Sequence, residues 1–109
     1  MSSGFAELPA ALSDSLRRSA QALDDGSADP EPLVSELAAH ELFRVGVPQE
    51  LGGMGGTLRD AVELLASVAE RSLTAAFVLW GQRTFVEYLR LTTNESLRER
   101  LLPPILNGR

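Results

Sequence analysis

Thiol, imidazole and amine side chains, which serve as nucleophiles, metal ligands or general bases, are nearly absent from this sequence. The 109 residues contain no cysteine and one histidine, His40, and every basic residue is an arginine. Thiol catalysis, disulfides, Cys-based metal sites, Schiff-base chemistry and a P-loop lysine are therefore excluded. His40 follows Leu33 and Leu37 on one face of an expected helix, with no second ligand near it. We interpret it as a partly buried structural residue.

Carboxylates are the remaining candidates for acid–base chemistry. Glu87 lies in an otherwise apolar segment, where it can pair with Arg83 or Arg90 or face a partner domain. Nothing in the sequence locates a substrate proton near Glu87, so we assign it no catalytic role. Glu70 and Arg71 are interpreted as a solvated pair. The sequence therefore predicts no catalytic residue and no metal ligand in this chain.

A glycine-rich segment from Val45 to Gly56 holds five of the nine glycines. A phosphate-binding loop would follow a strand, but here a helix is expected before the glycines, and the Walker lysine and the GxGxxG spacing are missing. The simpler interpretation is a tight connection between two helices, folded over the core. Val47, Leu51 and Met54 are its expected apolar anchors.

Four or five helices and no strand are expected to hold these segments, which predicts an all-α fold, a small helical bundle, as a single domain over residues 1–109. Hydrophobic periodicity and capping residues predict helices after Glu7, from Asp29-Pro30 to about Phe43, from Thr57 to about Arg71, from Leu73 to Leu91, and from Thr93 or Asn94 to an interruption at Pro103-Pro104.

The expected helix over residues 73–91 is apolar nearly all round, which is typical of a helix at the centre of its bundle. A stripe of Phe77, Trp80, Gly81, Thr84 and Tyr88 runs along it. Aromatic residues at helical spacing are most often core packing, and a glycine among them most often allows close helix approach.

Charge and hydropathy exclude several classes of partner. The formal net charge is −5, and the arginines are interspersed with acidic residues, which disfavours a nucleic-acid binder such as a helix-turn-helix protein. No apolar run approaches the ~20 residues that a membrane span needs, and the amino terminus has no signal-peptide pattern. We expect a soluble, cytoplasmic protein without nucleic-acid or membrane partners.

Three spaced segments carry a family resemblance. Gly46 to Gly55 reads GVPQELGGMG, Ser72 to Ala75 reads SLTA, and Thr93 to Gly108 reads TNESLRERLLPPILNG. In this order they are similar to the patterns G-(L/V)-P-E-x-x-G-G-x-G, S-T-A with one residue inserted, and T-x-E-x-x-R-x-x-L-P-x-L-x-x-G. Over residues 42–108 the chain therefore resembles the amino-terminal helical domain of the acyl-CoA dehydrogenase family.

The resemblance implies a flavoenzyme of acyl or fatty acid metabolism that oxidises acyl thioesters with FAD. Related flavin-dependent monooxygenases share the architecture. In the family the FAD contacts and the catalytic glutamate lie mainly in a middle β domain and a C-terminal helical domain, which we expect to be absent from these 109 residues. The chain alone is then expected to bind no cofactor and to be inactive, as a fragment, a truncated reading frame or one piece of a split enzyme. Its expected partners are those domains, in cis or in trans, in a homo- or hetero-oligomer.

The resemblance also implies candidate site residues. In the family, the apolar helix after the small-residue step lines the far end of the acyl pocket, which points to Ala76, Phe77 and Trp80 in this chain. The bulky indole of Trp80 would shorten or reshape that pocket. The alternative interpretation is a stand-alone helical interaction module that binds a protein partner through residues 73–91.

Overall fold

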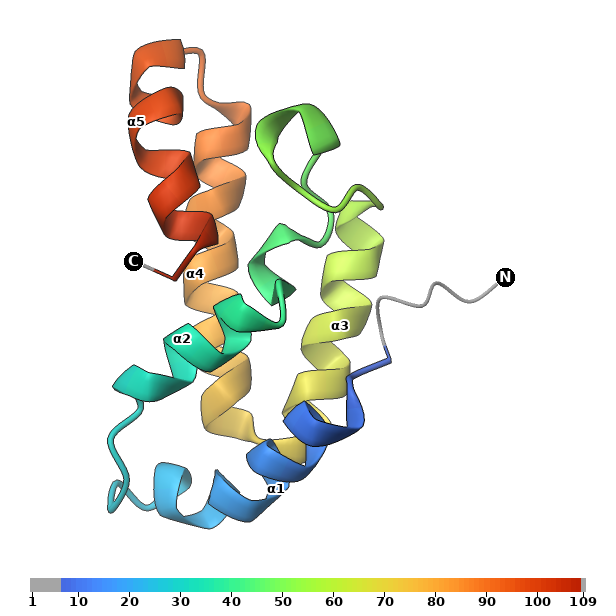
Figure 1. The fold of residues 1–109 in the computed structure, drawn as a ribbon, viewed down its shortest axis with the longest axis vertical. Helices are drawn as coiled ribbons and strands as arrows, with labels where there is room; N and C mark the ends of the chain where they lie inside the picture. The colour runs from blue at the N-terminus through green and yellow to red at the C-terminus, as the bar shows by residue number, and fades with distance from the viewer. Residues whose placement is uncertain (1–6, 109) are drawn as a thin grey trace.

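The computed structural model describes residues 7–108, which form five α-helices and two 3-10 helices (Figure 1). The bounds are α1 (Ala10–Asp24), α2 (Glu31–Ala39), η2 (Leu42–Arg44), η3 (Gln49–Leu51), α3 (Leu58–Arg71), α4 (Leu73–Leu91) and α5 (Glu95–Leu106). The described residues contain two isolated β-bridges but no β-strand. These findings confirm the all-α fold class.

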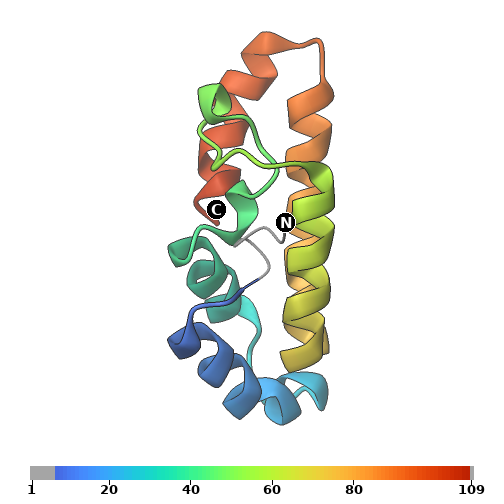
Figure 2. The same cartoon turned by 90° about the vertical axis from the view of Figure 1, so that its right-hand side faces the viewer.

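The helices stand in two layers around one core. Figure 2 shows α3 in front of α4 in one layer, where the two helices are in contact, with α2, α5 and the glycine-rich segment in the other layer and α1 crossing one end. The helix α4 packs against all four other α-helices and against η2. The fully buried side chains between the layers include Leu12, Leu16, Leu37, Phe43, Val47, Val68, Val86, Leu89 and Leu106. Within residues 7–108, no helix is both long enough and apolar enough to cross a membrane.

Side-chain caps begin three helices where the sequence predicts them. Thr57 accepts a hydrogen bond from the Asp60 amide, and the Asp60 carboxylate accepts one from the Thr57 amide, which completes a capping box at α3. Ser72 caps α4 and Asn94 caps α5. Ser72 alone joins α3 to α4, and the two helices pack against each other as a hairpin.

The second helix is shorter than the periodicity predicts. It ends at Ala39, and Glu41 adopts a left-handed conformation with φ of 63° before the short helix η2 begins. This turn directs Leu42 and Phe43 into the core, where they are 4% and 0% exposed. The two residues are core residues in either arrangement, so their spacing did not reveal the break in the helix.

The proline pair does not interrupt the last helix. The helix α5 continues through Pro103 and Pro104 to Leu106. Leu102 and Leu106 lie on either side of the pair and are 2% and 1% exposed, so core packing holds the last turn in place. The Asn107 amide donates to the carbonyls of both prolines, and the chain then turns at Gly108, which has a positive φ.

Candidate functional site

The outer face of α4 carries a row of exposed apolar side chains. Phe77, Trp80 and Tyr88 are 62%, 58% and 59% exposed, and Leu73 and Leu91 extend the row to both ends of the helix. A Cβ added at Gly81 would meet no atom within 4 Å. The expectation that this stripe is core packing, with Gly81 allowing close helix approach, is therefore wrong. Helical spacing shows which residues share a face, but not whether a neighbouring helix covers it.

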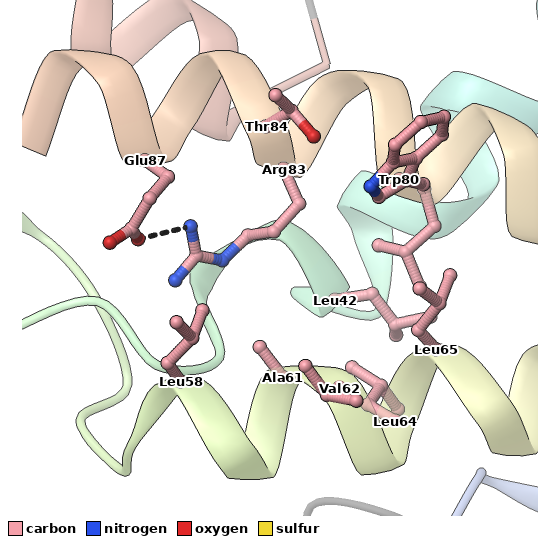
Figure 3. Close-up of a pocket in the computed structure, with 11 residues that line it drawn as sticks. Leu42, Leu58, Ala61, Val62, Leu64, Leu65, Trp80, Arg83, Thr84 and Glu87 are labelled. Carbon is pink, nitrogen blue, oxygen red and sulfur yellow. Dashed lines mark hydrogen bonds and ion pairs between the residues drawn. The ribbon is translucent and has the colours of Figure 1, made fainter.

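A groove of about 230 Å³ opens between α3 and α4 (Figure 3). Its α3 side is aliphatic, with Leu58, Ala61, Val62 and Leu64 among the lining residues. Its α4 side consists of Leu79, Trp80, Arg83, Thr84 and Glu87. Figure 3 shows Trp80 toward one end of the groove and Glu87 toward the other, with the Arg83 side chain extending from α4 toward α3. The groove is therefore mostly apolar, with charged side chains at one end.

A second apolar hollow, also of about 230 Å³, lies next to this groove. It is lined by Leu65, Ala69, Leu73, Ala76, Phe77 and Trp80, so the structure brings together all three candidate wall residues. Ala76 is buried at its floor, whereas Phe77 and Trp80 are exposed. Leu65 and Trp80 line both the hollow and the groove, so the indole stands between the two.

Three charged side chains form a network at the end of the groove. Glu87 accepts a hydrogen bond from Arg83 Nη1 at 2.9 Å and one from Arg90 Nη2 at 2.5 Å, which confirms that Glu87 pairs with arginines on its own helix. Hydrogen bonds from Arg90 and then from Arg83 hold the pKa of Glu87 below its usual range. Glu87 is thus kept ionised and paired with two arginines.

The sequence did not predict that Arg83, besides pairing with Glu87, binds the backbone of the glycine-rich segment. Arg83 is 7% exposed and is the one buried charged residue among residues 7–108. Besides Glu87, it donates from Nε to the Val45 carbonyl at 3.0 Å and from Nη2 to the Gly46 carbonyl at 3.2 Å. An arginine within an otherwise apolar helix was the available signal, because a buried guanidinium requires several acceptors.

The glycine-rich segment directs its amides toward its own carbonyls. The Gly46 amide donates to the Gly55 carbonyl, the Gly55 amide to Val47, and the Met54 amide to Arg44. These three amides are therefore not available to bind a pyrophosphate. Val47 and Leu51 are buried or half-buried, but Met54 is 38% exposed, so its expected role as an anchor is wrong.

The remaining candidates, His40, Glu70 and Arg71, lie in positions that support the fold. His40 is half-buried at the end of α2, as expected. Glu70 is exposed and pairs with Arg71, but Arg71 also donates to Ser13 Oγ of α1 at 3.0 Å. The pair is thus not merely solvated, because it joins α3 to α1. Across the described part of the chain, no group of three or more His, Asp or Glu side chains is placed to hold a metal ion.

Comparisons with known proteins agree with this architecture. The family model described as "Acyl-CoA dehydrogenase, N-terminal domain" matches residues 7–109. A benzylmalonyl-CoA dehydrogenase from Aromatoleum aromaticum is 34% identical over 90 residues, which cover 82% of this chain and 24% of that protein. No solved structure gives a significant match. The chain therefore belongs to the acyl-CoA dehydrogenase family and corresponds to its N-terminal domain.

Proposed function

We propose that this chain serves as the N-terminal helical domain of an FAD-dependent enzyme that oxidises an acyl thioester, and that it has no activity by itself. Family membership supports the reaction class, and the relative's name supports an acyl-CoA substrate. The aligned segment is only 24% of that relative, so we assign the FAD contacts and the catalytic carboxylate to other domains, in cis or in trans. FAD bound there supplies the redox chemistry of the reaction.

Within that enzyme, the proposed task of this chain is to form part of the acyl-pocket wall and to pack against the other domains. The observation that carries this proposal is the apolar hollow around Ala76, Phe77 and Trp80. Ligand sites are concave and largely apolar, and an uncharged acyl group needs such a lining. The exposed row on α4 is the matching interface, since large exposed apolar patches mark interaction sites.

The first experiment tests assembly with flavin. The purified chain should be colourless, and flavin absorbance should co-elute with it on size-exclusion chromatography when the remaining domains are co-expressed as a separate polypeptide. Those domains expressed without this chain should retain less flavin and show no dehydrogenase activity. The proposal is wrong if the chain neither binds them nor changes their flavin content and activity.

The second experiment tests the pocket wall in the assembled enzyme. Trp80→Ala should shift the preferred acyl group toward longer or bulkier ones, because it joins the hollow to the groove. Phe85→Ala is the matched control, since Phe85 is an exposed aromatic residue on the same helix that lines neither space. An unchanged ratio of kcat/KM values across acyl lengths for Trp80→Ala would place the indole outside the pocket.

The exposed row on α4 also favours a second candidate, a helical interaction module that needs no flavoprotein partner. If that candidate is right, light scattering should show that the isolated chain self-associates through α4 at micromolar concentration.

A flavin-dependent monooxygenase is a variant of the first proposal, in which the complete enzyme uses the same architecture for oxygenation. Oxygen consumption coupled to a hydroxylated product would distinguish it from a dehydrogenase that transfers electrons to an artificial acceptor.

A further inference from the structure

The glycine-rich segment and the groove meet at a single side chain. Arg83 lines the groove, and two of its nitrogens donate to the carbonyls of Val45 and Gly46 at the start of that segment. Its third nitrogen donates to Glu87, which also lines the groove and is held in turn by Arg90. A planar guanidinium can join these acceptors because its donors point in fixed, divergent directions.

The backbone around Gly46 is shaped to let Arg83 approach. Gly46 has φ of +78°, and a Cβ there would lie 2.7 Å from the Thr57 carbonyl and 3.0 Å from Arg83 Nη2. The Gly46 amide donates to the Gly55 carbonyl at 2.9 Å, so the opposite limb of the segment is linked to the same point. Both limbs of the segment, the start of α3 and the Arg83 side chain of α4 therefore converge at Gly46.

We infer that Arg83 is a positioning residue that couples the glycine-rich segment to the groove between α3 and α4. Through Val45 and Gly46 it sets where the segment lies, and through Glu87 it sets the charged end of the groove. A displacement of the segment moves the guanidinium, and with it the groove lining on α4. The coupling involves residues of this chain alone. Only its effect on an acyl group bound near the groove rests on the proposed function.

The coupling can be measured with a reporter that the sequence already contains. Trp80 is the single tryptophan and lines the groove one turn before Arg83, so its indole N–H gives one resolved signal in a ¹H–¹⁵N spectrum. Gly55→Ala strains the segment, because Gly55 has φ of +79° while its added Cβ would meet only the Gln49 side chain at 3.8 Å. Gly26→Ala is the matched control, with φ of +80° and nothing within 4 Å, in the turn between α1 and α2.

We expect Gly55→Ala to shift the Trp80 indole signal and to accelerate amide exchange at Gly46 at least tenfold, while Gly26→Ala changes neither. In an Arg83→Met background, the indole shift caused by Gly55→Ala should fall by at least half. Should that variant fail to fold, Arg83→Lys replaces it, because one ammonium cannot reproduce the fork across two carbonyls and a carboxylate.

Two results would overturn the inference. One is an indole shift of undiminished size in the Arg83 variants, which would show that packing elsewhere carries the effect. The other is an unmoved indole signal in Gly55→Ala despite faster exchange in the segment. Neither result depends on flavin or on activity, so the failure of this coupling and the failure of the proposed enzyme function can be told apart.

Discussion

The two faces of α4 are alike in composition but opposite in environment. On the inner face, Leu79, Val86 and Leu89 are at most 2% exposed and fill the space between the two layers. On the outer face, Phe77, Trp80, Tyr88 and Leu91 are 58–65% exposed. The inner face holds this domain together, whereas the outer face contributes little to its folding. A row of large exposed apolar side chains is typical of an interaction surface or a ligand-binding groove.

The sharpest test of this contrast uses two leucines on the same helix. Leu89→Ala should lower the free energy of unfolding by about 2–5 kcal/mol, because it leaves a cavity in the core. Leu91→Ala, at a position 65% exposed, should change it by less than about 0.5 kcal/mol. Urea denaturation followed by circular dichroism measures both. Equal effects would mean that the outer face is packed in solution.

A smaller loss of stability is expected when the buried arginine of α4 is replaced. Arg83→Met should destabilise the domain by about 1–3 kcal/mol, because the Val45 and Gly46 carbonyls lose their donors. Arg59→Met is the control, since the Arg59 side chain is 86% exposed and pairs with Glu63 at the surface. The control should change the unfolding free energy by less than about 0.5 kcal/mol. Similar values for both variants would remove the distinction between the buried and the exposed arginine.

On the outer face, the expected effect is on association and not on stability. Phe77→Asp should weaken binding of this chain to the remaining enzyme domains at least tenfold, about 1.4 kcal/mol, because it places a charge in an apolar interface. The thermal midpoint of the isolated chain should stay unchanged within error. Titration calorimetry with the separately expressed domains measures the affinity. Undiminished binding would mean that a different surface of the chain meets its partner.

The smallest effect concerns pH. Arg90 and Arg83 depress the pKa of Glu87 below the ordinary value of 4.5, so Glu87 contributes stability above that pH and loses it as pH falls toward its folded pKa. The difference in unfolding free energy between the protein and Glu87→Gln should therefore shrink as pH is lowered from 7 to about 3. Denaturation at several pH values tests this. A difference that grows on acidification would contradict the pairing.

Much of the fold follows from local residue patterns. Thr57, Ser72 and Asn94 are caps whose side chains accept backbone amides at helix starts, and such contacts involve neighbours in sequence. The ends of α4 were predicted from the limits of the apolar run between Leu73 and Leu91. In contrast, α5 continues through two prolines, because burial of Leu102 and Leu106 outweighs local preference. The early end of α2 coincides with the left-handed conformation of Glu41, which the periodicity did not reveal.

The candidate site could be predicted only in part. Ala76, Phe77 and Trp80 were identified through the family resemblance, and they do line one hollow. The exposure of Phe77 and Trp80 was not predicted, because a helix that is apolar all round has no periodic signal to distinguish its covered face from its open one. The groove was missed altogether, since its lining comes from residues of η2, α3 and α4 that are distant in sequence.

The sequence alone was thus enough to predict where most helices begin, the caps Thr57 and Asn94, the glycine-rich connection and the family. Each of these depends on contacts within a few residues or on motifs in a set order. Packing in three dimensions decides which face of α4 meets the core, where the groove opens, and that Arg83 reaches Val45 and Gly46, some 37–38 residues earlier in the chain. Burying a guanidinium is unfavourable unless its acceptors are already in place, and those acceptors exist only after the segment has folded against the helix.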